Sequence, residues 1–211
     1  MVITYARRVP RRWDQTIEKH REGVHRAILD TTWALVSERG LRAVTMSQIA
    51  AQAGIGRATL YKYFPDIEAI LLAWHRCHVA GHLAHLAELA GRPGPARDRL
   101  EAVLEAYATI SHRRGRHAPD LDMLLHHHQD VTHAHEQLRE LLEGLLAEGA
   151  AAGDLRGDVA PDELAVFCLR ALTAAADLPD EGAVRRLVSL ALAAVRPASH
   201  PPSSRPAGDT G

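Results

Sequence analysis

The sequence predicts an all-α protein of about nine helices, and three observations support this fold class. Aromatic residues make up only 4% of the chain, while Ala and Leu recur throughout it. Runs rich in Val, Ile and Thr, which favour strands, are few. Apolar residues recur at helical spacing within segments bounded by Gly and Pro. Because 46% of the residues are hydrophobic, one or two domains can each bury a packed core.

The first third of the chain predicts one long helix and two short ones. The long helix covers about 14–39, and Gly40 can end it in a left-handed conformation. The short helices cover 46–53 and 57–63, with Gly54 permitting a sharp turn between them. Thr45 is well placed as the N-cap of the first short helix.

A fourth helix begins after Asp66, which can cap it, and runs to about residue 90, so the first structural unit ends within a helix and not at a flexible linker. Gly and Pro residues bound five further helices, predicted at 96–112, 119–128, 131–152, 161–176 and 180–195. The resulting domains are a basic arm at 1–14, a helix-turn-helix domain at 15–66, a second helical domain at 67–196 and a disordered tail at 197–211.

Charge is distributed unevenly along the chain. Residues 1–65 hold 11 Lys or Arg and 5 Asp or Glu, a net charge of +6, whereas the remainder holds 14 and 21, a net charge of −7. A basic first third suggests a polyanionic partner for that part alone. Within the arm, Arg7, Arg8, Arg11 and Arg12 form either a solvated tail or a segment laid on phosphates or in a minor groove.

Other compositional features narrow the class of protein. No stretch approaches the roughly 20 apolar residues of a membrane span, and Met1–Pro10 lacks the apolar core of a secretion signal, so no membrane partner is predicted. Cys77 and Cys168 lie far apart with no CxxC spacing, which predicts two free thiols. A cytoplasmic location is expected.

The stretch TMSQIAAQAGIGRATLYKYF, residues 45–64, has the pattern of a helix-turn-helix. Small and apolar residues supply the contact between its helices, leaving Arg57, Thr59, Tyr61 and Lys62 at exposed positions with no carboxylate among them to repel phosphate. The alternative is a plain helical hairpin with core tyrosines. Tyr61 and Tyr63 are spaced i and i+2, however, and cannot both face one core.

This stretch, extended to TMSQIAAQAGIGRATLYKYFPDIEAI and preceded by AILDTTWALVSERGLRAVT, resembles the TetR family of regulators over about residues 27–70. Beyond residue 90 the resemblance thins to helix count, helix length and the phrase GDLRGDVAPDELA. The resemblance implies an N-terminal three-helix helix-turn-helix domain joined to a helical ligand-binding and dimerisation domain. It also implies a double-stranded DNA operator as partner.

The resemblance further implies roles for individual residues. Thr45, Tyr61 and Tyr63 would touch phosphates, and Arg57, Ala58, Thr59 and Lys62 would lie on or beside the recognition surface; Gln48 completes the predicted DNA-binding set. Two positions depart from the family. Gly56 stands where Ser is frequent, which weakens capping of the recognition helix, and Ile67 stands where Lys is frequent, which removes one phosphate contact.

The last two helices are predicted to form a homodimer interface, because a single recognition helix reads too few base pairs for a specific site. The expected apolar stripes are Leu164, Phe167, Cys168 and Ala171 on one helix, and Val184, Leu187, Val188, Ala191 and Val195 on the other. The alternative is that both stripes complete the core of the monomer. The resemblance favours the interface.

The chain contains 14 histidines, several of them clustered. His75, His78, His82 and His85 fall within about 80° of the fourth helix and are expected to look inward, while a second cluster surrounds 126–135. The histidines could line a mixed-polarity pocket, bind a metal, or lie on the surface as plain or pH-sensitive groups. The predicted pocket wall comprises Trp74, His78, His82, Tyr107, Met123, His126 and Phe167.

Together these features predict a ligand-responsive transcriptional regulator, a repressor, that binds a palindromic operator as a dimer. A small-molecule effector of unknown identity would release it by acting through the fourth helix. No cofactor or resident metal is predicted, although a metal-responsive regulator is an alternative. An enzyme with a histidine base lacks a supporting catalytic motif, and a nonspecific DNA-coating protein would share the basic end without sequence preference.

Overall fold

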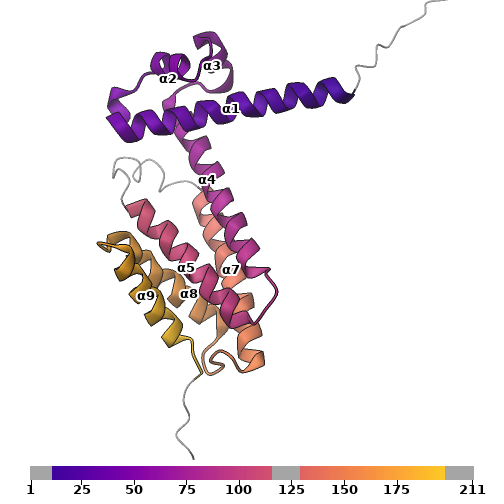
Figure 1. The fold of residues 1–211 in the computed structure, drawn as a ribbon, viewed down its shortest axis with the longest axis vertical. Helices are drawn as coiled ribbons and strands as arrows, with labels where there is room; N and C mark the ends of the chain where they lie inside the picture. Colours follow the sequence, from indigo (N-terminus) through magenta and orange to yellow (C-terminus); the bar gives the residue numbers. More distant parts are fainter. Residues whose placement is uncertain (1–10, 116–128, 198–211) are drawn as a thin grey trace, which may run out of the picture. The chain divides into compact units, whose positions relative to one another are not determined.

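The computed structural model describes the backbone of residues 11–115 and 129–197, and the side chains of 18–113 and 133–197. Every regular element in these ranges is helical, which confirms the predicted all-α class (Figure 1). The elements are α1 (Arg11–Arg39), η1 (Leu41–Ala43), α2 (Met46–Gln52), α3 (Arg57–Tyr63), α4 (Ile67–Ala90), α5 (Ala96–Gly115), α7 (Gln129–Ala152), α8 (Pro161–Thr173), η2 (Ala174–Asp177) and α9 (Glu181–Ala194). The predicted helix at 119–128 and the tail beyond residue 197 lie outside the described residues.

The helix boundaries differ from the predicted ones mainly at the N-terminus. The first helix begins at Arg11, three residues before its expected start, so Arg11 and Arg12 belong to α1 and not to an arm. The rest of the predicted arm lies outside the described residues. At the other end, Gly40 has a positive φ of 81°, which favours glycine, but its ψ of 154° differs from that of the left-handed conformation expected there.

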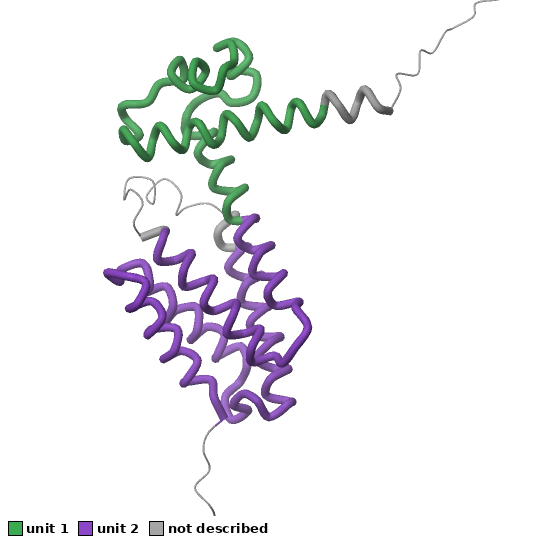
Figure 2. Tube along the Cα trace, viewed as in Figure 1, with its two compact units in different colours: residues 1–79, 118–127 green, residues 80–117, 128–211 purple. Residues whose placement is uncertain are grey.

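The chain forms two compact units, one extending to Val79 and the other starting at Ala80 (Figure 2). The boundary falls within α4, as expected for a first structural unit that ends inside the fourth helix, and it lies beyond residue 66, the limit given for the helix-turn-helix domain. Each unit has its own buried apolar cluster.

The first unit packs α1, α2, α3 and the start of α4 around one core. Ile28, Leu35, Ile49, Leu60 and Ile70 are among its most deeply buried side chains. These residues come from all four helices, so the core fixes the arrangement of the two short helices. Burial of large apolar side chains supplies the main favourable free energy for this arrangement.

Local chemistry sets the ends of the short helices. Thr45 is the N-cap of α2 and forms a capping box with Gln48, whose backbone N–H donates to the Thr45 hydroxyl at 3.3 Å. Gly54 follows α2 with a φ of 69°, which favours glycine over any residue with a Cβ. Gly56 begins α3 without a side-chain cap, as its departure from Ser predicts. Asp66 caps α4 by accepting from the Ala69 N–H at 2.8 Å.

An aromatic stack joins α1 to α4 inside the first unit. The rings of Trp33 and Trp74 lie parallel, with centroids 3.7 Å apart, and the His78 ring lies 3.8 Å from Trp74. Stacked rings add to the free energy gained from burial alone. The stack therefore makes the first turns of α4 part of the helix-turn-helix unit.

The second unit is arranged around α5, which packs against α7, α8, η2 and α9. Leu100, Val103, Leu104 and Ala108 of α5 are fully buried at the centre of its core. Arg99, also on α5, donates to the Ala90 carbonyl at 3.0 Å and to the Glu148 carboxylate. It thereby ties the end of α4 and the C-terminal part of α7 to α5.

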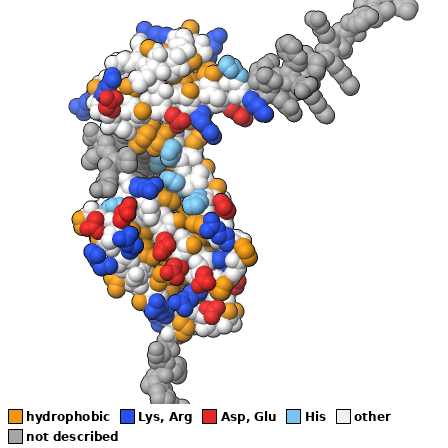
Figure 3. Space-filling model, in the orientation of Figure 1, with side chains coloured by type: hydrophobic (Ala, Val, Ile, Leu, Met, Phe, Trp, Pro, Cys, Tyr) orange, Lys and Arg blue, Asp and Glu red, His pale blue; other side chains and the backbone are white. Residues whose placement is uncertain are grey.

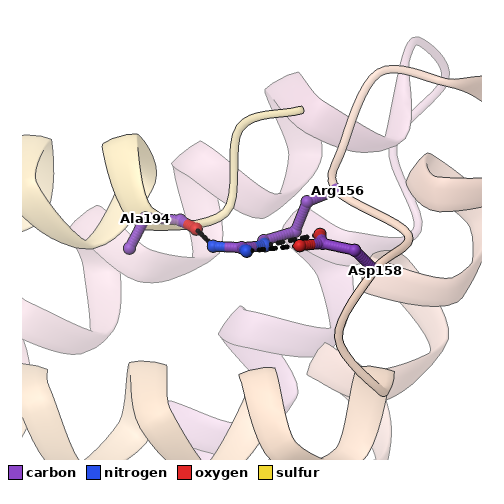
Figure 4. A network of polar contacts seen from close by, with 3 residues as sticks. All are labelled: Arg156, Asp158 and Ala194. Atoms are coloured by element: carbon purple, nitrogen blue, oxygen red, sulfur yellow. Dashed lines mark hydrogen bonds and ion pairs between the residues drawn. The ribbon is translucent and has the colours of Figure 1, made fainter. Parts of the chain in front are cut away.

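Both ends of α9 are fixed by polar contacts. Asp180 accepts from the Ala183 N–H at 2.8 Å, and this hydrogen bond lowers the pKa of the Asp180 carboxyl. At the other end, Arg156 donates to the Ala194 carbonyl at 2.9 Å (Figure 4). The Arg156 guanidinium also donates to both carboxylate oxygens of Asp158, at 2.9 and 2.7 Å. These hydrogen bonds raise the pKa of Arg156.

The turn at Gly54 yields a test of the first unit. Gly54→Ala should lower the free energy of unfolding by about 1–2 kcal/mol, because a Cβ disfavours the left-handed conformation although no atom lies within 4 Å of it. Gly54→Asn should cost less, since Asn tolerates this conformation. Chemical denaturation monitored by circular dichroism measures both values. Equal stability of wild type and the Ala variant would contradict the strain argument.

Candidate functional site

The short helix α3 presents nearly all of its side chains to solvent. Only Leu60 is buried, at 0% exposure, while Tyr63 is partly buried. The predicted recognition residues Arg57, Ala58, Thr59, Tyr61 and Lys62 are all exposed. Tyr61 keeps 46% of its surface accessible, so the alternative of a plain hairpin with a core tyrosine pair does not hold. Leu60 holds the helix in the first core, and the exposed side chains of α3 are available for contact with another molecule.

The surface around α3 is basic. No Asp or Glu occurs between Thr45 and Pro65, and neither Arg57 nor Lys62 forms an ion pair in the part of the chain that the structure describes. Figure 3 shows Lys and Arg side chains along the edge of the first unit where α2 and α3 lie. Charged donors without a competing carboxylate suit contact with phosphate.

Arg57 lies over the ring of Tyr61, with its guanidinium carbon 5.7 Å from the ring centroid. The two residues are one helical turn apart, so the contact needs no distortion of α3. A cation–π contact of this kind restricts the long Arg side chain at an exposed site. It orders two neighbouring groups of the recognition surface before any partner arrives.

Thr45 and Gln48 lie at the exposed start of α2, but both are engaged with each other. The Thr45 hydroxyl donates to the Gln48 side-chain carbonyl at 3.0 Å, and that carbonyl also accepts from the Thr45 backbone N–H at 2.8 Å. The pair therefore defines the N-terminus of α2. Its hydrogen bonds would have to rearrange for the Thr45 hydroxyl to donate to a phosphate.

Behind α3, His25 of α1 packs on the end of the recognition helix. Its ring centroid lies 5.1 Å from that of Phe64 and 6.4 Å from that of Tyr63. Sequence reasoning did not single out His25, because a lone histidine on a long helix gives no signal of its ring contacts. The packing leaves Tyr63 half-covered, with one side against α1.

Comparison with known proteins bears on this geometry. The family model described as "Bacterial regulatory proteins, tetR family" matches residues 28–74. The HTH-type transcriptional repressor KstR2 of Rhodococcus jostii (strain RHA1) is 30% identical over 145 residues, covering 66% of this chain and 71% of that protein. The chain belongs to the TetR family.

Further similarities lie in the same family. The Fatty acid metabolism regulator protein of Bacillus subtilis (strain 168) is 23% identical over 145 residues, covering 65% of this chain and 74% of that protein. A TetR/AcrR family regulator from Thermobifida fusca YX-ER1 shares the fold with a TM-score of 0.69 at 22% identity, over 80% of this chain and 96% of that one. FadR from Bacillus subtilis in complex with stearoyl-CoA does so with a TM-score of 0.60 at 17% identity, over 81% and 98%. This TetR-family chain is therefore a transcriptional regulator with an N-terminal helix-turn-helix.

The apolar stripes expected to form a dimer interface are instead largely part of the TetR-family chain's own second core. Leu164, Cys168, Val184, Val188 and Val195 are buried there against neighbouring helices. The prediction assigned these stripes to the wrong surface, because helical spacing groups residues on a face without showing what covers that face. Phe167 is the exception, since 44% of its surface is exposed.

Three large apolar side chains of α8 and α9 are exposed. Val166 and Phe167 on α8 are exposed at 46% and 44%, and Leu190 on α9 at 69%. With Tyr61, they are the exposed large hydrophobic residues of the described part of the chain. Three such residues on two packed helices mark a surface suited to a protein partner.

The histidines of α4 do not look inward as predicted. His78, His82 and His85 are exposed and His75 is only partly buried, and histidine side chains are visible on the surface in Figure 3. The reason is that their stripe is covered at its ends alone: Leu71 and Trp74 enter the first core, and Leu86 and Leu89 enter the second. The described residues also include no group of three or more side chains placed to hold a metal.

The residues of the predicted pocket wall are divided between the two units and differ in burial. Trp74 is buried in the first core and Tyr107 in the second, whereas His78, His82 and Phe167 are exposed. Met123 and His126 lie outside the described residues.

A buried histidine that the prediction passed over is His112, in the last turn of α5. Its Nδ1 lies 3.0 Å from the Ala175 carbonyl oxygen. His112 is the last residue of the helix predicted at 96–112, and this position gave no indication that its side chain would enter the core.

Two remaining predictions concern the thiols and membranes. Both cysteines are free, with Cys77 exposed and Cys168 buried. Burial raises the pKa of the Cys168 thiol to about 11, so this group is protonated and unreactive near neutral pH. Among the described residues, no helix has the length and apolar character needed to cross a membrane.

Proposed function

We propose that this TetR-family regulator is a repressor that binds a near-palindromic operator as a homodimer and leaves it when a small-molecule effector binds the second unit. The observation that carries the proposal is the exposed, carboxylate-free surface of α3, a helix whose Leu60 is buried in the first core. A repressor among the relatives, KstR2, supports the direction of regulation.

The same relatives support an apolar effector. One is named a fatty acid metabolism regulator, and a structure of similar fold holds stearoyl-CoA. Another structural neighbour is the ketosteroid transcriptional regulator KstR2 of Mycobacterium tuberculosis. The second unit of this chain has a core rich in Leu and Ala around α5, which is compatible with a ligand that is mostly apolar.

In the proposed complex, α3 enters the major groove of DNA. Tyr61 and Tyr63 contact phosphates, while Arg57, Ala58, Thr59 and Lys62 lie at or beside the base edges. Thr45 and Gln48 contact the backbone at the start of α2 once their mutual hydrogen bonds rearrange. Phosphate contacts would set affinity for any sequence, and base contacts would set preference.

Substitutions in α3 test this division of roles. Tyr61→Ala should weaken binding to all duplexes by a similar factor, whereas Thr59→Val should mainly change which sequences are preferred. Selection of bound genomic fragments, followed by fluorescence anisotropy on selected and random duplexes at several salt concentrations, measures both effects. Arg97→Ala, which removes an exposed cation from α5, serves as the matched control and should leave both unchanged. Equal, uniform losses from both α3 variants would contradict the assignment.

The homodimer is proposed to form through the exposed face of α8 and α9. Val166, Phe167 and Leu190 would pack against the same face of the partner across a two-fold axis, so each contact between different residues would occur twice. The polar contacts of Asp180 and Arg156 at the two ends of α9 would hold Leu190 in register. A two-fold dimer would space its recognition helices by about one turn of DNA, about 34 Å.

A charge on this face should dissociate the dimer. Leu190→Glu and Phe167→Glu should each raise the dimer dissociation constant by about 30-fold or more, because a buried carboxylate would replace an apolar contact. Analytical ultracentrifugation over a concentration series measures the constant. Ala147→Glu, on an exposed position of α7, is the matched control. Unchanged dimers from both variants would place the interface elsewhere.

Helix α4 is proposed to couple the effector to DNA, since it belongs to both compact units. Gly81 lies two residues beyond the unit boundary, within the helix, and no atom lies within 4 Å of the position its Cβ would occupy. Packing therefore does not require glycine there. A glycine inside a helix lowers local helix stability by about 0.5–1 kcal/mol relative to Ala, which makes this turn easier to bend.

Gly81→Ala should stiffen the helix without a clash. Amide hydrogen exchange in the turn after residue 81 should slow by about two- to fivefold, and affinity should fall more steeply than in wild type when one base pair is inserted between operator half-sites. Gly144→Ala, another open glycine inside a helix, should slow exchange in α7 only. If the inserted base pair lowers the affinity of wild type and of the Gly81 variant by the same factor, a bending role for this turn is contradicted.

A further inference from the structure

The interior of the second unit contains two adjacent polar side chains. Among the described residues of that unit, Ser111 and His112 are the only buried polar or charged ones. His112 is exposed at only 4%. Its neighbours are apolar, since Ala108 precedes it by one turn of α5 and Ala175 of η2, which its ring contacts, is fully buried.

One hydrogen bond settles the tautomer of the neutral His112 ring. Nδ1 lies 3.0 Å from the carbonyl oxygen of Ala175, and a carbonyl can only accept, so Nδ1 must carry the hydrogen. In the neutral ring Nε2 then has no hydrogen and presents a lone pair. This nitrogen is shielded from solvent and has no hydrogen-bond partner in the part of the chain that the structure describes.

Such an atom is costly to bury. An acceptor buried without a partner costs about 1–3 kcal/mol, and the large majority of buried polar side-chain atoms in proteins have a partner. Leu or Phe would fill the same volume in this apolar core without that cost. The histidine is therefore explained if a donor reaches Nε2 in a functional state of the protein.

We infer that His112 is the polar anchor of the effector site, where Nε2 accepts a hydrogen bond from a hydroxyl group on an otherwise apolar small molecule. The inference rests on the proposed function, because it assigns the polar contact of the effector that the function requires. The apolar side chains around the ring would take the body of the molecule.

A carboxylate ligand is a different case. A carboxylate has only acceptors, so it could bond to Nε2 only if the ring were doubly protonated. In the neutral ring, with the hydrogen on Nδ1, Nε2 instead matches a donor. The test therefore includes an alcohol, an ether and a carboxylate of equal chain length.

Two substitutions distinguish the roles of the two ring nitrogens of His112. In His112→Asn, the side-chain NH2 can occupy the place of Nδ1 and keep the bond to Ala175, but nothing replaces Nε2. In His112→Gln, the longer amide reaches the place of Nε2 and can accept there. The Asn variant thus keeps the hydrogen bond to Ala175 but lacks the acceptor at the Nε2 position. The Gln variant has an acceptor at that position again. Thermal unfolding of both variants without ligand shows whether each is folded.

The probes are n-alkanols of about six to twelve carbons, their methyl ethers and the matching n-alkanoates, added to the full-length protein. Thermal shift and isothermal calorimetry measure binding, and nitrogen-15 NMR of the histidine rings reports on Nε2. The wild-type protein should bind its best alkanol about fivefold more tightly than the matching ether, the value of one hydrogen bond of about 1 kcal/mol. The Nε2 signal of His112 should move on adding the alkanol.

The variants complete the test. His112→Asn should bind alkanol and ether equally, and His112→Gln should regain the preference for the alkanol. A ring with its hydrogen on Nε2, no preference for the alkanol in wild type, tighter binding of the alkanoate, or an unchanged preference in folded His112→Asn would each overturn the inference. Failure of the proposed function would be seen separately, as the absence of any preference for selected over random DNA.

Discussion

The recognition surface depends on the burial of a single side chain, Leu60. A seven-residue helix such as α3 is too short to be stable alone in water, so it must be held by tertiary packing. Leu60 provides that attachment, within a core formed by α1, α2 and the start of α4. Because the attachment uses one position, the other positions of α3 can carry groups chosen for a partner. The division between one inward and several outward residues is what makes α3 a recognition element.

Two features of the first unit compensate for the weak capping of α3. Gly56 offers no side-chain oxygen to the first turn of the helix. At the other end, Phe64 is buried and packs against His25, which fixes the chain where α3 stops. The helix is thus secured by its middle and its C-terminus. The N-terminal turn, which carries Arg57, is ordered instead by the contact of Arg57 with the Tyr61 ring.

The sequence allowed the helices and their caps to be predicted, because these depend on neighbouring residues. Thr45 and Asp66 act at the helix ends as expected, and α3 begins and ends at the predicted residues. The faces were harder to predict. Periodicity placed His78, His82 and His85 on one stripe of α4, but whether a stripe is buried depends on which helices reach it, and none of the described helices covers these residues.

The same limit explains the misplaced interface on α8 and α9. Each helix has apolar residues on more than one face, and sequence alone favours the continuous stripe as the predicted interface. The structure places the continuous stripe inside, where a core needs unbroken apolar packing, and leaves Val166, Phe167 and Leu190 outside. A core can be completed within one chain, whereas these three side chains gain free energy only if another molecule covers them. The exposed apolar side chains, although fewer than the buried ones, are therefore the better indication of where a partner binds.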